Sequence, residues 1–284
     1  MRTEQEMLKL VLSTAEHDER IRAVILNGSR ANPNANPDRF QDFDIIYLVT
    51  EMTPYVDDPT WIDRFGERMI LQMPSLMDDP ESKDTPGFTY LMQFMDGNRI
   101  DLSLIPVDRF FELPKDSLTH VLLDKDSRLD DIPPANEASY LPEPPTAKDF
   151  NDCYNEFWWI ASYVAKGLAR DQILYAKKML EIMRDQLMKM LTWYFGIKTG
   201  FQRNPGKIGK HFKEILSAED WDRLLATYAS AENQATWQSL FNMISLFRDC
   251  THGVAHFFQY PYPESEDRRV YSYLQYIYEG EWKD

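Results

Sequence analysis

The first half of the chain alternates short apolar runs with breaker-rich loops, a pattern that predicts β-strands. Four runs are rich in β-branched or aromatic residues and end at turn residues, as the strands of a small sheet do. They are 21–26, 44–49, 88–95 and 99–105. The last two are separated by Asp96-Gly97, a pair that favours a tight hairpin turn. A short helix is expected over 60–68, and the spacing Thr3-x-x-Glu6 is a capping box that predicts a helix start.

In the second half of the chain the apolar positions recur at helical spacing. Five periodic segments are predicted to be helices, namely 150–168, 172–195, 218–228, 232–258 and 265–278. The segment 130–146 before them contains more proline than a helix or a central strand tolerates, so we place the domain boundary there. We therefore predict an α+β fold, in which an N-terminal domain with a small mixed sheet (1–135) is followed by an α-helical bundle domain (136–284).

Negative charge is concentrated in the strand-rich half. The chain carries a net charge of −15, and residues 1–145 hold 28 acidic side chains against 14 basic ones. Such a field repels a nucleic-acid backbone and favours metal ions and polycationic small molecules. Solubility alone is an equally good explanation of the charge. We expect no nucleic-acid partner.

Cysteine content and hydropathy indicate the compartment. The two cysteines, Cys153 and Cys250, both fall in helical patterns and are predicted to be reduced core thiols. The N-terminal segment has no basic region leading into an apolar core, so no signal peptide is expected. No apolar run approaches the length that spans a bilayer, so no membrane partner is expected either. A cytoplasmic protein is the expectation; the sequence leaves the oligomeric state open, with a monomer favoured.

Candidate chemistry gathers at the ends of three predicted strands. Gly28-Ser29 follows the first strand, Asp42 and Asp44 stand at the start of the second, and Asp101 lies on the fourth. Gly28 would let the backbone approach a phosphate, and Ser29 offers amide and hydroxyl donors. Because Asp42 and Asp44 are two residues apart, they project to one edge of the sheet, where Asp101 can complete a cluster for two Mg²⁺ ions.

This set of residues supports transfer of the α-phosphoryl group of a nucleoside triphosphate. A surface turn capped by carboxylates remains the alternative for Asp42 and Asp44, and a strand-edge charge remains the alternative for Asp101.

The ordered set resembles the polymerase-β-like nucleotidyltransferase superfamily, and wider segments look like the aminoglycoside 6-adenylyltransferases that modify streptomycin. The matching segments are 27–32, 40–45, 96–102, 163–170, 173–176 and 246–248. The resemblance implies a nucleotidyltransferase domain, a helical domain, and transfer of AMP from ATP to a streptidine-ring hydroxyl. Asp101 is the candidate to deprotonate that hydroxyl. A different acceptor, or a non-catalytic nucleotide-binding module of the same fold, is the alternative.

Several basic residues are candidates to bind the triphosphate. Arg30 follows the Gly-Ser turn, and it could contact phosphate or be a solvated loop residue. Lys166 and Arg170 share a helix face, and Lys177 and Lys178 follow on the next helix. As in the resembling family, Lys166 and Lys177 could reach ATP from the helical domain, although an exposed charged face is the simpler interpretation.

Overall fold

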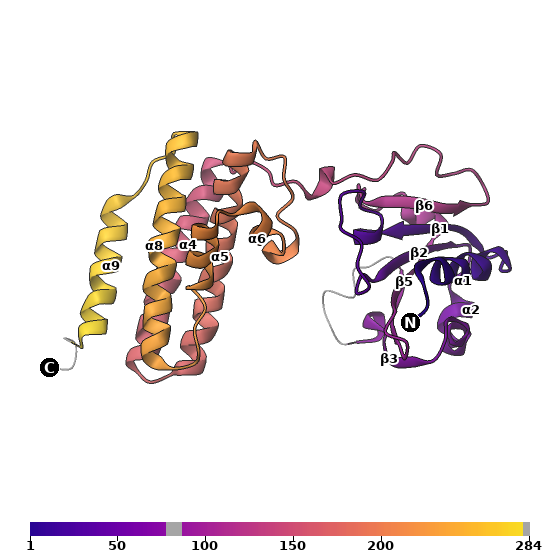
Figure 1. The fold of residues 1–284 in the computed structure, drawn as a ribbon, viewed down its shortest axis with the longest axis horizontal. Helices are drawn as coiled ribbons and strands as arrows, with labels where there is room; N and C mark the ends of the chain where they lie inside the picture. Colours follow the sequence, from indigo (N-terminus) through magenta and orange to yellow (C-terminus); the bar gives the residue numbers. More distant parts are fainter. Residues whose placement is uncertain (78–86, 281–284) are drawn as a thin grey trace. The chain divides into compact units, whose positions relative to one another are not determined.

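The computed structural model describes residues 1–77 and 87–280. The chain divides into two compact units, unit 1 (Met1–Ser139) and unit 2 (Tyr140–Asp284), and the division falls inside the proline-rich segment 130–146. Unit 1 contains a mixed sheet and unit 2 is helical, so the predicted α+β fold is confirmed (Figure 1).

The sheet of unit 1 has six strands in the order β3-β4-β5-β2-β1-β6. They are β1 (Ile21–Asn27), β2 (Phe43–Val49), β3 (Arg68–Gln72), β4 (Phe88–Phe94), β5 (Arg99–Pro106) and β6 (Thr119–Asp124). Among the strands that the structure describes, β2 and β5 pair in parallel and the other four pairs are antiparallel. After β2 the chain forms β3 and β4, which lie further from β2 in the sheet. It then returns as β5, which lies between β4 and β2 (Figure 1).

Two strands were absent from the sequence prediction, and one predicted helix is shorter than expected. The helical part of 60–68 is a 3₁₀-helix, η2 (Pro59–Phe65), and Arg68 already belongs to β3. β3 is an edge strand whose apolar side chains are mostly exposed, so it lacks the alternation that marks a half-buried strand. β6, at the other edge, has one buried residue and likewise gives a weak signal.

One face of the sheet packs against helical elements. α1 (Glu4–Glu16) begins at the predicted capping box, and α2 (Thr53–Val56) and η2 lie in the same hydrophobic core. The fully buried side chains on β5 are Ile100, Leu102 and Leu104. The intervening residues of β5 therefore lie on the opposite face of the sheet. On that face, α3 (Val107–Phe110) and a smaller hydrophobic core cover only the strand ends on the side where β5 leads into α3.

Unit 2 is a helical bundle with its own core. Its helices are α4 (Ala147–Ala169), α5 (Ile173–Thr199), α6 (Phe212–Ile215), α7 (Ala218–Leu225), α8 (Asn233–Phe258) and α9 (Glu264–Glu279). All five predicted helices are present, and α6 was missed because four residues are too short to show a period. Phe157 of α4 stacks on Phe247 of α8 with ring centroids 3.5 Å apart. Cys153 and Cys250 are buried and free, as predicted for core thiols.

Over the described residues, none of the helices combines the length and apolar character that a membrane span needs.

Candidate active site

Gly28 stands where strand β1 turns into a short 3₁₀-helix, η1 (Gly28–Arg30). Its φ of +70° lies in the left-handed region that favours glycine. A Cβ at this position would lie 2.2 Å from Oδ2 of Asp44, which no real contact allows. The glycine is therefore required both by its conformation and by the close approach of the Asp44 carboxylate. The turn that carries Ser29 is thus held directly beside the acidic strand.

The three predicted carboxylates lie on one face of the sheet. In the parallel pairing of β2 with β5, Asp44 is the direct partner of Asp101. Asp42 precedes β2 by one residue and lies two residues from Asp44, while Phe43 between them is buried in the core. The alternation of strand side chains thus places Asp42, Asp44 and Asp101 together on the face opposite α1.

Arg99 neutralises part of this cluster. Its Nε donates to Oδ1 of Asp101 at 2.7 Å and its Nη2 donates to Oδ2 at 2.8 Å, a two-pronged pairing within one strand. The same Nε is 3.7 Å from Oδ2 of Asp42. Arg99 and Asp101 are two residues apart on β5 and share one face of the strand, but Arg99 was not among the residues predicted for the site.

Burial and mutual repulsion weaken the acidity of the carboxylates. Burial, and then the negative charges of Asp101 and Asp42, together raise the pKa of Asp44 to about 6 against the opposing charge of Arg99. Burial also raises the pKa of Asp42, while Arg99 lowers it. The cluster therefore holds more negative charge than Arg99 alone compensates.

The donor set fits a divalent cation, although it is not yet arranged around one. Aspartate oxygens are the ligands that Mg²⁺ prefers, and uncompensated negative charge favours a cation at this place. Over the described parts of the chain, however, no group of three or more His, Cys, Asp or Glu side chains is arranged to hold a metal ion. Both oxygens of Asp101 are instead turned to Arg99.

Arg30 is engaged with the backbone that leads into β2. Its Nε donates to the Asp42 carbonyl oxygen at 3.1 Å and its Nη2 donates to the Gln41 carbonyl oxygen at 2.8 Å. Its guanidinium lies 3.8 Å from the ring centroid of Phe43, and only 7% of its side chain is exposed. Arg30 is therefore not a solvated loop residue, and it fixes the segment that carries Asp42. A contact between Arg30 and phosphate stays a prediction.

The two predicted lysines make contacts inside unit 2. Lys177 Nζ donates to the Ala229 carbonyl oxygen at 2.7 Å. Lys166 Nζ lies 5.9 Å from the ring centroids of both Tyr163 and Tyr273. That these lysines bind the triphosphate stays a prediction. The predicted site residues that lie together in the structure are the five of unit 1, namely Gly28, Ser29, Asp42, Asp44 and Asp101.

Sequence reasoning missed one further polar pair at this site. Asn27 is the cross-strand partner of Asp44, and its Nδ2 donates to Oδ2 of Asp116 at 3.3 Å. Asp116 is among the charges that raise the pKa of Asp44. It lies in the segment before β6, the strand that the sequence did not predict, so no signal in the chain connected it with the cluster.

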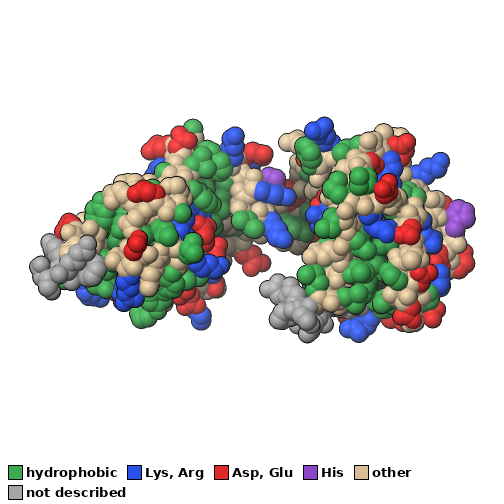
Figure 2. Space-filling model, turned by 90° about the horizontal axis from the view of Figure 1, so that it is seen from below, with side chains coloured by type: hydrophobic (Ala, Val, Ile, Leu, Met, Phe, Trp, Pro, Cys, Tyr) green, Lys and Arg blue, Asp and Glu red, His purple; other side chains and the backbone are tan. Residues whose placement is uncertain are grey.

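An apolar groove adjoins the acidic cluster on the same unit. It has a volume of about 590 Å³ and is lined by Arg99, by Leu91 and Gln93 of β4, and by residues of β3 and the turn after it. Leu91 is the cross-strand partner of Asp101. Figure 2 shows apolar side chains exposed on the sheet-bearing unit at the right, and Ile70 and Leu76, which line this groove, are 66% and 65% exposed.

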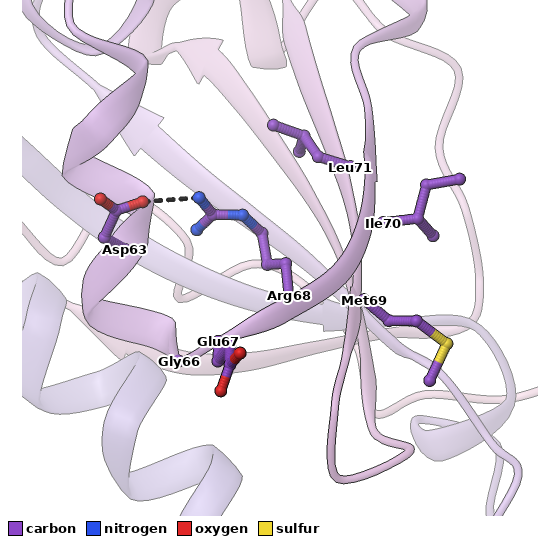
Figure 3. Close-up of a pocket in the computed structure, with 7 residues that line it drawn as sticks. All are labelled: Asp63, Gly66, Glu67, Arg68, Met69, Ile70 and Leu71. Atoms are coloured by element: carbon purple, nitrogen blue, oxygen red, sulfur yellow. Dashed lines mark hydrogen bonds and ion pairs between the residues drawn. The ribbon is translucent and has the colours of Figure 1, made fainter.

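A second hollow lies at the β3 edge and is separate from the chemistry described above. It is lined by Asp63 and by residues 66–71, and Arg68 donates to Asp63 at 2.6 Å (Figure 3). Met69 and Ile70 point away from that ion pair (Figure 3). None of the site residues predicted from the sequence is in this lining.

Comparison with known proteins gives one consistent family. A family model described as streptomycin adenylyltransferase matches residues 1–277. The chain is 41% identical over 283 residues to an aminoglycoside 6-adenylyltransferase of Bacillus subtilis (strain 168), covering 98% of this chain and 99% of the relative. It is 42% identical over 278 residues to an aminoglycoside 6-adenylyltransferase of Campylobacter jejuni, covering 96% and 95%.

Among solved structures, the crystal structure of an aminoglycoside 6-adenyltransferase from Bacillus subtilis is similar, with 37% sequence identity and a TM-score of 0.48. The match covers 98% of this chain and 99% of that one. The sequence matches extend through both units, so the sheet and the helices belong to one family pattern.

Proposed function

The chain belongs to the streptomycin adenylyltransferase family and is a nucleotidyltransferase, and on that premise we propose that it transfers AMP from ATP to a hydroxyl group of streptomycin. One observation carries the proposal. The Gly28 turn closes directly on the Asp44 carboxylate, and Asp44 is in register with Asp101 on the neighbouring strand. The turn proposed to bind phosphate is therefore adjacent to the acidic cluster.

The turn binds the triphosphate. Backbone N–H groups at Gly28 and Ser29, together with the Ser29 hydroxyl, donate hydrogen bonds to the outer phosphate oxygens. The absence of a side chain at Gly28 lets those oxygens approach the backbone while Asp44 fills the space behind it. This binding orients the α-phosphate toward the carboxylates of β2 and β5.

Asp42, Asp44 and Asp101 would hold two Mg²⁺ ions. When bound, these ions supply positive charge for the phosphoryl oxygens and the leaving pyrophosphate. The acceptor oxygen attacks the α-phosphorus, the bond from that phosphorus to the bridging oxygen of the β-phosphate breaks, and pyrophosphate leaves. The hydroxyl proton passes to a carboxylate oxygen of Asp101, which orients the hydroxyl for in-line attack.

Streptomycin is the proposed acceptor because its chemistry complements the charge of this unit. Its guanidinium groups are cations that pair with carboxylates, and residues 1–145 carry twice as many acidic as basic side chains, 28 against 14. The names of the relatives and of the family support the same acceptor class.

Pyrophosphate release tests the proposal. The protein is incubated with ATP and Mg²⁺ and with streptomycin, kanamycin or spectinomycin in turn. We expect release with streptomycin and little with the other two. Release with kanamycin or spectinomycin in preference to streptomycin would refute the acceptor, and no release with any aminoglycoside would refute the function.

A further inference from the structure

Arg99 lies beside the carboxylates that are proposed to hold the metal ions. It lies on β5 two residues from Asp101 and on the same face, and its guanidinium takes up both oxygens of that carboxylate, at 2.7 and 2.8 Å. It also approaches Oδ2 of Asp42 at 3.7 Å. One side chain thus contacts two of the three carboxylates proposed to hold the metal ions.

This pairing and full metal coordination compete for the same oxygens. Mg²⁺ requires ligand oxygens at about 2.0–2.1 Å in nearly octahedral geometry. A carboxylate that accepts a fork of two N–H groups directs its lone pairs to the guanidinium instead. The described residues accordingly contain no ready-made group of metal ligands, although three carboxylates share the face.

Charge leads to the same competition. Asp42, Asp44 and Asp101 carry three formal negative charges when ionised, and Arg99 reduces the total to two. A divalent cation entering beside Arg99 is therefore repelled by the guanidinium and attracted by a weaker field than the carboxylates alone would exert.

The Arg99 side chain has room to move away from Asp101 and still remain beside the acidic cluster. Its side chain is 38% exposed, so burial does not lock it in place. It lines the groove of about 590 Å³ that runs over β4 toward β3, and its cross-strand partner there is Gln93. A guanidinium that swings away from Asp101 can enter this groove and still remain beside the cluster.

We propose that Arg99 is a resident counter-ion of the acidic cluster, which a divalent cation must displace from Asp101 before the site is complete. Arg99 thereby sets the metal concentration at which the site fills. This inference rests on the proposed function, because it takes Asp42, Asp44 and Asp101 as the metal-binding set.

The test measures metal binding without nucleotide or acceptor. Mn²⁺ is titrated into the protein at pH 8, and the free ion is followed by its electron paramagnetic resonance signal. We expect Arg99→Gln to bind Mn²⁺ more tightly than the wild type, by roughly 5- to 20-fold, because one competing cation has been removed. Arg99→Lys keeps the positive charge but loses the two-pronged pairing with Asp101. Its affinity for Mn²⁺ should therefore lie between those of the wild type and Arg99→Gln.

Arg22→Gln is the matched control. Arg22 also forms a two-pronged pair, with Asp126, but it lies near the start of β1, whereas Asn27 and the Gly28 turn are at its end. The control removes the same charge from unit 1 and should leave Mn²⁺ affinity unchanged within about twofold. Circular dichroism spectra that match the wild type check that each variant is folded.

The possible results distinguish a wrong counter-ion role for Arg99 from a wrong set of metal-binding residues. If Arg99→Gln binds Mn²⁺ no more tightly than the wild type or Arg22→Gln, the counter-ion role is wrong while the metal site stands. If neither the wild type nor Arg99→Gln binds Mn²⁺, the metal-binding set itself is wrong and the inference falls with it. The Mg²⁺ concentration for half-maximal pyrophosphate release should fall in Arg99→Gln by a similar factor, and a rise would contradict the proposal.

Discussion

Gly28 makes clear how much of this site depends on single residues. The position needs a left-handed backbone with φ of +70°, and it also needs the space that a Cβ would take from Asp44. Arg30, two residues later, fixes the carbonyl oxygens of Gln41 and Asp42. The turn and the acidic segment are therefore built against each other, so a change in one displaces the other.

Replacing Gly28 by alanine separates conformation from catalysis. We expect Gly28→Ala to lower the free energy of unfolding by about 1–2 kcal/mol, because alanine is strained at positive φ. We also expect it to lower the rate of pyrophosphate release by roughly 100-fold or more, because the new Cβ displaces the Asp44 carboxylate. Urea unfolding and a steady-state assay measure the two effects.

Gly200→Ala is the control for that substitution. Gly200 has a φ of +60°, and a Cβ there would meet no atom within 4 Å. It should lose similar stability and keep full activity. Retention of near-wild-type activity by Gly28→Ala would show that Asp44 does not need its observed position.

At the scale of elements, the sheet depends on an ion pair that ties the N-terminus to the β4–β5 hairpin. Arg2 Nε donates to Oδ2 of Asp96 at 2.7 Å, and the Arg2 guanidinium lies 4.8 Å from the ring centroid of Phe94. Asn98 donates to both partners, to the Arg2 carbonyl oxygen and to Oδ2 of Asp96. The predicted Asp96-Gly97 turn is thus also the anchor for the start of α1.

That ion pair should make the free energy of unfolding depend on pH in the acidic range. Burial would raise the pKa of Asp96, but hydrogen bonds from Arg2 and Asn98 outweigh it and hold the pKa well below its ordinary value of 3.8. A lowered pKa contributes stability that is present above pH 4 and is lost as the pH falls below it. Asp96→Asn should therefore cost about 1 kcal/mol at pH 7, with solvent screening allowed for, and progressively less below pH 4.

Urea unfolding of both proteins at several pH values between 7 and 2.5 measures this difference. Asp108→Asn is the control, since the Asp108 side chain is 90% exposed, and it should match the wild type throughout. A difference between Asp96→Asn and the wild type that stays constant or grows toward pH 2.5 would contradict the assignment.

How much of the fold could be predicted from the sequence depends on how deeply each strand is buried. Strands β1, β2, β4 and β5 have buried residues in clear runs or alternation, so they were predicted. Gly28, Asp42, Asp44 and Asp101 were predicted with them, at or near the ends of β1, β2 and β5. The edge strands β3 and β6 bury little, so periodicity could not reveal them. The contacts of Arg99 with Asp42, of Arg30 with the segment before β2 and of Asn27 with Asp116 join parts that are separated along the chain. They depend on side-chain direction as well, which the pattern of a single sequence does not encode.

At the scale of the whole molecule, charge divides the chain. Residues 1–145 have twice as many acidic as basic side chains, while the remainder of the chain is close to balanced. The family match extends over residues 1–277 and thus includes both the acidic sheet unit and the helical bundle. Such a field would attract a cationic substrate to the unit that carries the candidate site.

This charge should make substrate binding sensitive to salt. We expect the KM for streptomycin to rise severalfold between about 50 and 300 mM KCl, because exposed ion pairs are screened over about 8–10 Å at physiological ionic strength. The KM for ATP, measured at constant free Mg²⁺, is the internal comparison and should change less. An unchanged KM for streptomycin across this range would mean that charge attraction does not contribute to its binding.

The most direct test of the central claim follows the fate of each phosphate. ATP labelled at the α-phosphate or at the γ-phosphate is incubated with Mg²⁺ and streptomycin, using the wild type and Asp44→Asn. We predict that the wild type transfers the α-label to streptomycin and releases the γ-label as pyrophosphate. Asp44→Asn, folded by circular dichroism, should transfer neither, since it lacks one of the carboxylates proposed to hold the metal ions. Appearance of the γ-label on streptomycin, or α-label transfer by Asp44→Asn at the wild-type rate, would contradict the account.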